Sequence, residues 1–75
     1  MPAAGRDVES LLEEMIASQG ERLHALAARI APHLTGDDLL QPHDHPEIRN
    51  HPDFQFEDGI LAGYLAVRAA LRASR

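Results

Sequence analysis

Three histidines near the middle of the chain have side chains that could do chemistry together. His43, His45 and His51 lie within nine residues of one another, among prolines and carboxylic acids. Neutral imidazole binds zinc, nickel and copper, and carboxylate oxygens often complete such sites. The segment therefore contains candidate ligands for a divalent metal, with zinc or nickel as the ion.

The spacing of these histidines also permits a purely structural interpretation. His43 and His45 could chelate one ion from an extended strand, but Asp44 would then point the other way, and the chain contains no His-x-x-x-His pair for a helix. The prolines and acidic residues around them are typical of turns and helix starts. We favour the structural interpretation and keep metal binding by His43, His45 and His51 as the alternative.

Two acidic residues, Glu57 and Asp58, follow the histidine segment closely. Together with Asp44 and His51 they could form a small ligand-binding or catalytic site between the connecting segment and the helices. The same acids suit the first turns of a helix, where the helix dipole stabilises negative charge. The chain has no cysteine, no Gly-x-Ser-x-Gly motif and no phosphate-binding glycine loop. We therefore expect neither enzymatic activity nor a bound cofactor, with the ligand site as a second alternative.

The distribution of charge limits the kinds of partner. The net charge is −5; residues 33–58 carry seven acidic side chains and one arginine, whereas residues 59–75 carry three arginines and no acid. An acidic middle repels phosphate backbones, so no nucleic-acid partner is expected. No stretch approaches the roughly 18 apolar residues needed to span a bilayer, and the first residues lack the pattern of a secretory signal. We therefore expect a cytoplasmic protein with no membrane partner.

Two long helices are predicted to position these groups. In residues 7–34 the apolar side chains recur every three or four positions, which is the helical period, and Asp7 can cap the start. Gln19 interrupts the apolar seam of this helix, and Pro32 should bend or end the helix nearby. The second long helix is predicted over residues 54–74, with Asp53 as its cap. Its inward stripe is expected to contain Phe56, Ile60, Tyr64, Val67 and Leu71.

The connecting segment, residues 35–53, is predicted to form short helical turns rather than an irregular loop. Thr35 and Asp38 have the spacing of a capping box, in which each side chain accepts a hydrogen bond from the other residue's backbone. Pro46 suits the first position of a further turn. The connector side chains expected to point inward are Leu39, Leu40 and Ile48.

The fold class that follows is all-α: one domain of 75 residues forming an antiparallel helical hairpin with a structured connector. Each long helix has an apolar band wider than a single neighbour can cover, so we expect two hairpins to pair as a homodimeric four-helix bundle. Small residues on the second helix would allow close packing there. The candidate interface residues are Leu23, Leu26, Ile30, Gly59, Gly63 and Ala66. The alternative is a compact monomer whose connector folds over the open side.

These features favour a small helical protein–protein interaction or assembly module without enzymatic activity. Its expected partner is a second copy of the chain, with another protein as a further candidate. Segments 38–44 and 56–63 resemble parts of small bacterial proteins. That resemblance implies no activity, so no functional residue is carried over from it.

Overall fold

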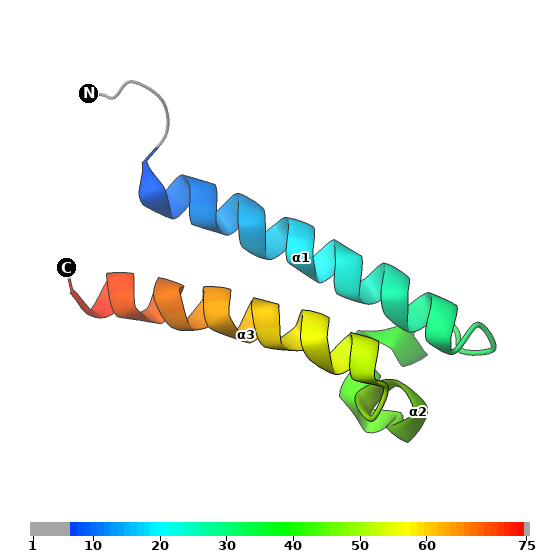
Figure 1. Ribbon diagram of the computed structural model, residues 1–75. Coiled ribbons are helices and arrows are strands. Elements are labelled where there is room, and N and C mark those ends of the chain that lie inside the picture. Colours follow the sequence, from blue (N-terminus) through cyan, green and yellow to red (C-terminus); the bar gives the residue numbers. More distant parts are fainter. Residues whose placement is uncertain (1–6, 75) are drawn as a thin grey trace.

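The structure, a computed structural model, describes residues 7–74 as two long antiparallel helices joined by short helical turns (Figure 1). The long helices are α1, Val8–Ile30, and α3, Pro52–Ala73. Between them lie two 3-10 turns, η1 (Asp38–Leu40) and η2 (Pro42–Asp44), and the single-turn helix α2 (Pro46–Arg49). No strand occurs in the described residues. The predicted all-α hairpin with a structured connector is therefore confirmed.

Helix α1 begins as predicted and ends earlier than predicted. The Asp7 carboxylate accepts a hydrogen bond of 2.8 Å from the Ser10 backbone N–H, which caps the helix. The helix ends at Ile30 rather than at residue 34. Ala31 has left the helical region, with φ −128° and ψ 69°, because the ring of Pro32 disfavours helical geometry in the residue before it.

The connector begins with the predicted capping box. The Asp38 backbone N–H donates to the Thr35 hydroxyl at 3.2 Å, and the Thr35 N–H donates back to the Asp38 carboxylate at 3.0 Å. Leu39 and Ile48 are buried as expected, whereas Leu40 is 72% exposed, so the inward placement of Leu40 was wrong. Consecutive side chains in a 3-10 turn point about 120° apart, so Leu39 and Leu40 cannot both face inward.

Helix α3 begins at Pro52, two residues before the predicted start, and its cap is His51 rather than Asp53. The His51 ring nitrogen Nδ1 accepts a hydrogen bond of 3.2 Å from the Asp53 backbone N–H. Proline suits the first helical position because its fixed φ is already helical and its missing N–H needs no partner there. Asp53 instead lies in the first turn, where its negative charge is favourable.

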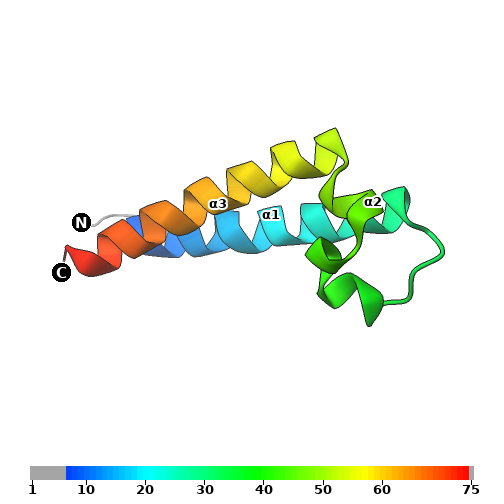
Figure 2. The ribbon, with the colours of Figure 1, turned by 90° about the horizontal axis from the view of Figure 1, so that it is seen from below.

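The hydrophobic core occupies one end of the hairpin. The core cluster draws on α1, the connector and the start of α3, and its members are Leu23, Leu26, Ala27, Ala31, Leu39, Ile48 and Phe54. Figure 2 shows the connector lying to one side of the layer that the two long helices form. Ile48 and Phe54 are the largest fully buried side chains. The connector therefore closes one end and one side of the hairpin and leaves the other side open.

The molecule is elongated, with extents of 48 × 21 × 20 Å. Along residues 7–74, neither long helix has the length and apolar character needed to cross a bilayer. The termini of the described chain lie together at the end away from the connector (Figure 1). At that end Arg68 and Arg72 of α3 form ion pairs with Glu13 of α1, at 3.0 and 3.6 Å.

Candidate functional site

Two of the connector histidines, His43 and His51, direct their rings to separate partners. The Nε2 atom of His43 lies 3.1 Å from the Asp58 carboxylate on α3. The His43 ring also packs edge-on against Phe54, with ring centroids 5.5 Å apart. His43 therefore ties turn η2 to the first half of α3.

The other two predicted metal ligands have local structural roles. His51 caps α3 through its ring nitrogen. The residue before α2 is His45, and its backbone carbonyl accepts hydrogen bonds from the N–H groups of Ile48 and Arg49 at 3.0 and 2.9 Å. A fourth histidine, His33, lies 3.4 Å from the Glu47 carboxylate.

Among residues 7–74, no three side chains of histidine, aspartate or glutamate are gathered as a metal ion would require. His43, His45 and His51 come from η2, the start of α2 and the start of α3, and the first and last already bond to Asp58 and to the backbone of Asp53. The metal-binding alternative therefore finds no support in the described geometry.

A cavity of about 350 Å³ lies between the connector and the two long helices, where the second alternative placed a ligand site. We call it the connector pocket. Of the four residues predicted for that site, only Asp58 lines it, whereas Asp44, His51 and Glu57 do not. Its walls are mainly apolar, and none of the described residues that line it is a serine, threonine, lysine or cysteine that could act as a nucleophile. Its lining residues include Gly20, His43, Asp58 and Leu61.

A buried amide joins the two long helices near the middle of the hairpin. Gln19 is 7% exposed, and its Nε2 donates to both the backbone carbonyl and the carboxylate of Glu57, each at 2.8 Å. This polar residue in the predicted apolar seam is therefore satisfied by a partner on the other helix. Glu57, predicted as a dipole-matched first-turn acid, gains a second role as that partner.

Apolar side chains remain uncovered on the side of α1 that faces away from the connector. Val8, Leu11 and Met15 are all exposed. Leu11 precedes Arg29 by eighteen residues, which is five helical turns, so both lie on the same side of α1. Met15 and Arg22 are related in the same way by two turns. The exposed leucine and methionine therefore share one side of the helix with these two arginines.

Helix α3 presents a matching apolar stripe on that same side of the hairpin. Phe56 is 68% exposed and Val67 is 49% exposed, although both were expected to point inward with Tyr64 and Leu71. The predicted stripe was too wide for one neighbour, and α1 covers only its inner part. We call the open face the surface formed by Val8, Leu11 and Met15 of α1 with Phe56, Ile60 and Val67 of α3.

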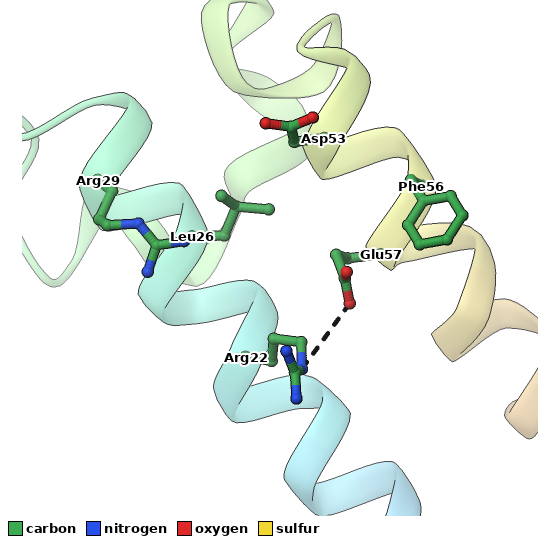
Figure 3. A pocket seen from close by; sticks show the side chains of 6 residues that line it. All are labelled: Arg22, Leu26, Arg29, Asp53, Phe56 and Glu57. Atoms are coloured by element: carbon green, nitrogen blue, oxygen red, sulfur yellow. Dashed lines mark ion pairs between the residues drawn. The ribbon is translucent and has the colours of Figure 1, made fainter.

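At the connector end of the open face, α1 and α3 enclose a groove of about 250 Å³ (Figure 3). Arg22 and Arg29 line it from α1, and Asp53, Phe56 and Glu57 line it from α3, with Leu26 as a further wall. Arg22 is 3.9 Å from the Glu57 carboxylate. The groove thus holds positive charge along one helix and negative charge along the other.

The predicted interface residues fall into two groups. Leu23 and Leu26 are buried within one chain, and Ile30 packs against the same core. Gly59, Gly63 and Ala66 are exposed on α3, and a Cβ built on either glycine meets no atom within 4 Å. A single chain therefore leaves the small residues accessible and uses the three α1 residues for its own core.

Sequence reasoning did not identify the groove or the exposure of Phe56 beside it. The usable signal was a heptad-like spacing of four and three residues along α3, which runs through Phe56, Ile60, Gly63, Val67 and Ala70. Comparison of the chain with protein-family models, with curated proteins and with solved structures finds no match. The geometry alone therefore supports the functional proposal.

Proposed function

We propose that this chain is a helical assembly module without enzymatic activity, which pairs through its open face to form a homodimeric four-helix bundle. The observation that supports this most is the distribution of apolar side chains. Large exposed ones gather on the open face, whereas the connector already covers much of the opposite side. Uncovered apolar stripes on two adjacent helices are what a second pair of helices packs against in a bundle.

Within the described residues, the half of the hairpin near the termini lacks a core of its own. Toward the termini, Leu12 is the only buried apolar side chain of the described residues, because the core cluster lies at the connector end. A chain of 75 residues buries a small fraction of its surface on folding. Leaving half of its length without a core therefore lowers its stability. A second hairpin would supply the missing half.

The expected affinity follows from the side chains that would be covered. Five of the open-face side chains are substantially exposed. A twofold interface covers these five side chains on both copies. Covering one such side chain contributes roughly 1 kcal/mol, so the gross gain is roughly 10 kcal/mol. Association itself costs at least about 4 kcal/mol. The difference is at most about 6 kcal/mol, so we expect a dissociation constant of tens of micromolar or weaker.

Two neighbouring positions on α3 provide a matched test. Val67 lies on the open face at 49% exposure, and Leu65 lies at 36% exposure on the opposite side, one and two turns after the pocket-lining Leu61 and Asp58. Sedimentation equilibrium should show a dimer for the wild-type chain and for Leu65→Glu, and a monomer for Val67→Glu. A wild-type monomer at hundreds of micromolar, or equal effects of the two variants, would remove the proposal.

A second candidate function rests on the connector pocket, whose apolar walls and His43–Asp58 pair could hold a small apolar molecule. Gly20 lines this pocket and has open space at its Cβ position, so Gly20→Leu should fill the pocket. Gly59→Leu adds the same side chain at an equally open position outside the pocket. Indole should shift NMR signals of the connector in the wild type and in Gly59→Leu only. No shifts, or equal shifts in all three proteins, would count against this candidate.

A further inference from the structure

The open face differs in chemistry from one end to the other, and this difference determines how two hairpins can be stacked. A twofold axis parallel to the helices puts both connectors at the same end and places α1 of each copy along α3 of the other. A twofold axis perpendicular to the helices puts the connectors at opposite ends and places α1 against α1. We call these the same-end and opposite-end arrangements.

Along α1, the side of the helix that contributes to the open face changes from apolar to positively charged. Val8, Leu11 and Met15 occupy the half near the termini, and Arg22 and Arg29 occupy the half near the connector. Opposite-end stacking would press the two arginines of one copy onto the apolar half of the other. Removing a guanidinium from water without a partner is strongly unfavourable, so the α1 surface is poorly complementary to itself.

Along α3, the charge near the connector has the opposite sign. Asp53 and Glu57 line the groove there, and the stripe continues through Ile60, Gly63 and Val67 without a charged side chain. Same-end stacking therefore brings the arginines of α1 to the acids of the partner's α3. It also brings the apolar half of α1 to the apolar half of α3. Charge and hydrophobicity are complementary at both ends only in this arrangement.

Phe56 has the features of an anchor residue for this arrangement. Its ring is 68% exposed and borders the groove, and Arg29 has no ion pair among the described residues (Figure 3). Aromatic and arginine side chains are the ones most often responsible for binding energy at protein interfaces. An arginine guanidinium is also attracted to the face of an aromatic ring.

We propose that the two hairpins pair with their connectors at the same end, and that Phe56 of each copy packs beside Arg22 and Arg29 of its partner. In this arrangement Arg29 of each copy also faces Asp53 of the other. This inference rests on the proposed homodimer, and its experiments separate a failure of the arrangement from a failure of dimerisation.

The arrangement can be measured directly because the chain has no cysteine. Nitroxide labels on Ser74→Cys, at the terminal end, and in a separate sample on Asn50→Cys, at the connector end, report distances between copies by pulsed electron resonance. Same-end pairing predicts short distances at both positions, roughly 25 Å for helices packed about 10 Å apart. Opposite-end pairing separates each pair by an additional axial distance of about 33 Å, the length of a 22-residue helix. Long distances at both positions would overturn the same-end arrangement but would still show a dimer. A monomeric sample in which no distance between labels is detected would overturn both the arrangement and the dimer.

A charge-reversal pair tests the contact between Arg29 and Asp53. Arg29→Asp alone and Asp53→Arg alone should each weaken self-association roughly tenfold, because each places like charges across the interface. An equimolar mixture restores opposite charges at both contacts between copies, whereas within each chain the two positions still repel. If the affinity between the two variants in the mixture returns to within about threefold of wild-type self-association, the arrangement is supported. A mixture as weak as the single variants would overturn it.

The anchor role of Phe56 is tested by a truncation with a matched control. Phe56→Ala should weaken the dimer roughly 10- to 30-fold, as expected for a central aromatic residue. Leu40→Ala removes an apolar side chain of similar exposure, 72%, from the connector and should leave the affinity within about twofold. Circular dichroism verifies that both variants remain helical. Equal affinities for the two variants would contradict the assignment of Phe56.

Discussion

At the scale of single residues, Gln19 is the polar side chain that fixes how the two long helices meet. Its amide is buried and donates twice to Glu57, once to the backbone and once to the side chain. A buried polar group is stabilising only where its partners are in place, so sliding α1 along α3 would leave the amide unsatisfied. Gln19 therefore specifies the register of the hairpin.

This role predicts a large effect of removing the amide. Gln19→Ala should lower the free energy of unfolding by about 1–3 kcal/mol, because it leaves a cavity and removes both hydrogen bonds. The matched control is Gln55→Ala, which removes an exposed amide that donates to the Arg49 carbonyl at 3.1 Å and should cost less than about 0.5 kcal/mol. Urea unfolding followed by circular dichroism measures both. Equal losses in the two variants would show that Gln19 does not set the register.

A second prediction at this scale concerns pH. Hydrogen bonds from the Thr35 backbone N–H, and then from its hydroxyl, hold the pKa of Asp38 below its ordinary value. A carboxylate with a depressed folded-state pKa stabilises the fold above its unfolded-state pKa. That contribution is lost as the pH falls through the folded-state pKa, which lies below the ordinary value of an aspartate.

The comparison of wild type with Asp38→Asn isolates this effect. At pH 6 the wild type should be the more stable protein, and the difference between the two in urea unfolding should shrink as the pH falls below about 4. A difference that stays constant from pH 6 to pH 2 would contradict the assigned role of the Asp38 carboxylate.

Residue types could be predicted from the sequence more readily than their partners. Gln19 stood out as a polar position in an apolar seam, and the Thr35–Asp38 box followed from spacing alone. The partner of His43 is Asp58, fifteen residues away, and that contact depends on the path of the whole connector. The path of the connector cannot be predicted from local sequence patterns.

At the scale of elements, prolines set the boundaries of the helices. Pro32 ends α1 near Ala31, and Pro46 and Pro52 begin α2 and α3. The cap of α3 is His51, a residue type that is uncommon at this position, which explains why Asp53 was the stronger expectation from sequence. His51, a predicted candidate metal ligand, instead caps the start of a helix.

The capping role predicts which substitutions at position 51 are tolerated. His51→Ala removes the acceptor for the Asp53 N–H and should lower stability by about 1 kcal/mol. His51→Asn restores a side-chain acceptor at the same position and should recover most of the loss. Thermal unfolding of the three proteins distinguishes capping from other roles, since an asparagine variant as unstable as the alanine variant would exclude it.

The side of each helix that is covered was harder to predict than its boundaries. The stripe from Phe56 to Leu71 is wide enough to serve two neighbours, and periodicity does not say which part meets α1. The structure covers its inner part and exposes Phe56 and Val67. An apolar band that is wider than one neighbouring helix can cover therefore indicates a second partner.

At the scale of the whole molecule, the hairpin is asymmetric in its packing. The connector supplies Leu39 and Ile48 to the core at one end, and nothing in residues 7–74 covers the opposite face or the terminal half comparably. The hairpin itself was predictable because two long periodic segments separated by prolines allow few other arrangements. The homodimer remains a prediction, since it concerns surfaces that one chain leaves open.

The most direct test is the dependence of stability on protein concentration. If the open face is completed by a second copy, dimerisation stabilises the folded state by mass action, so the urea midpoint should rise with concentration. Between about 2 and 200 μM, the wild-type midpoint should increase, with a gain approaching 2.7 kcal/mol for the hundredfold change if folding and pairing are fully coupled. A midpoint that is identical at the two concentrations, with the protein fully folded at the lower one, would contradict the central claim that the open face is an interface.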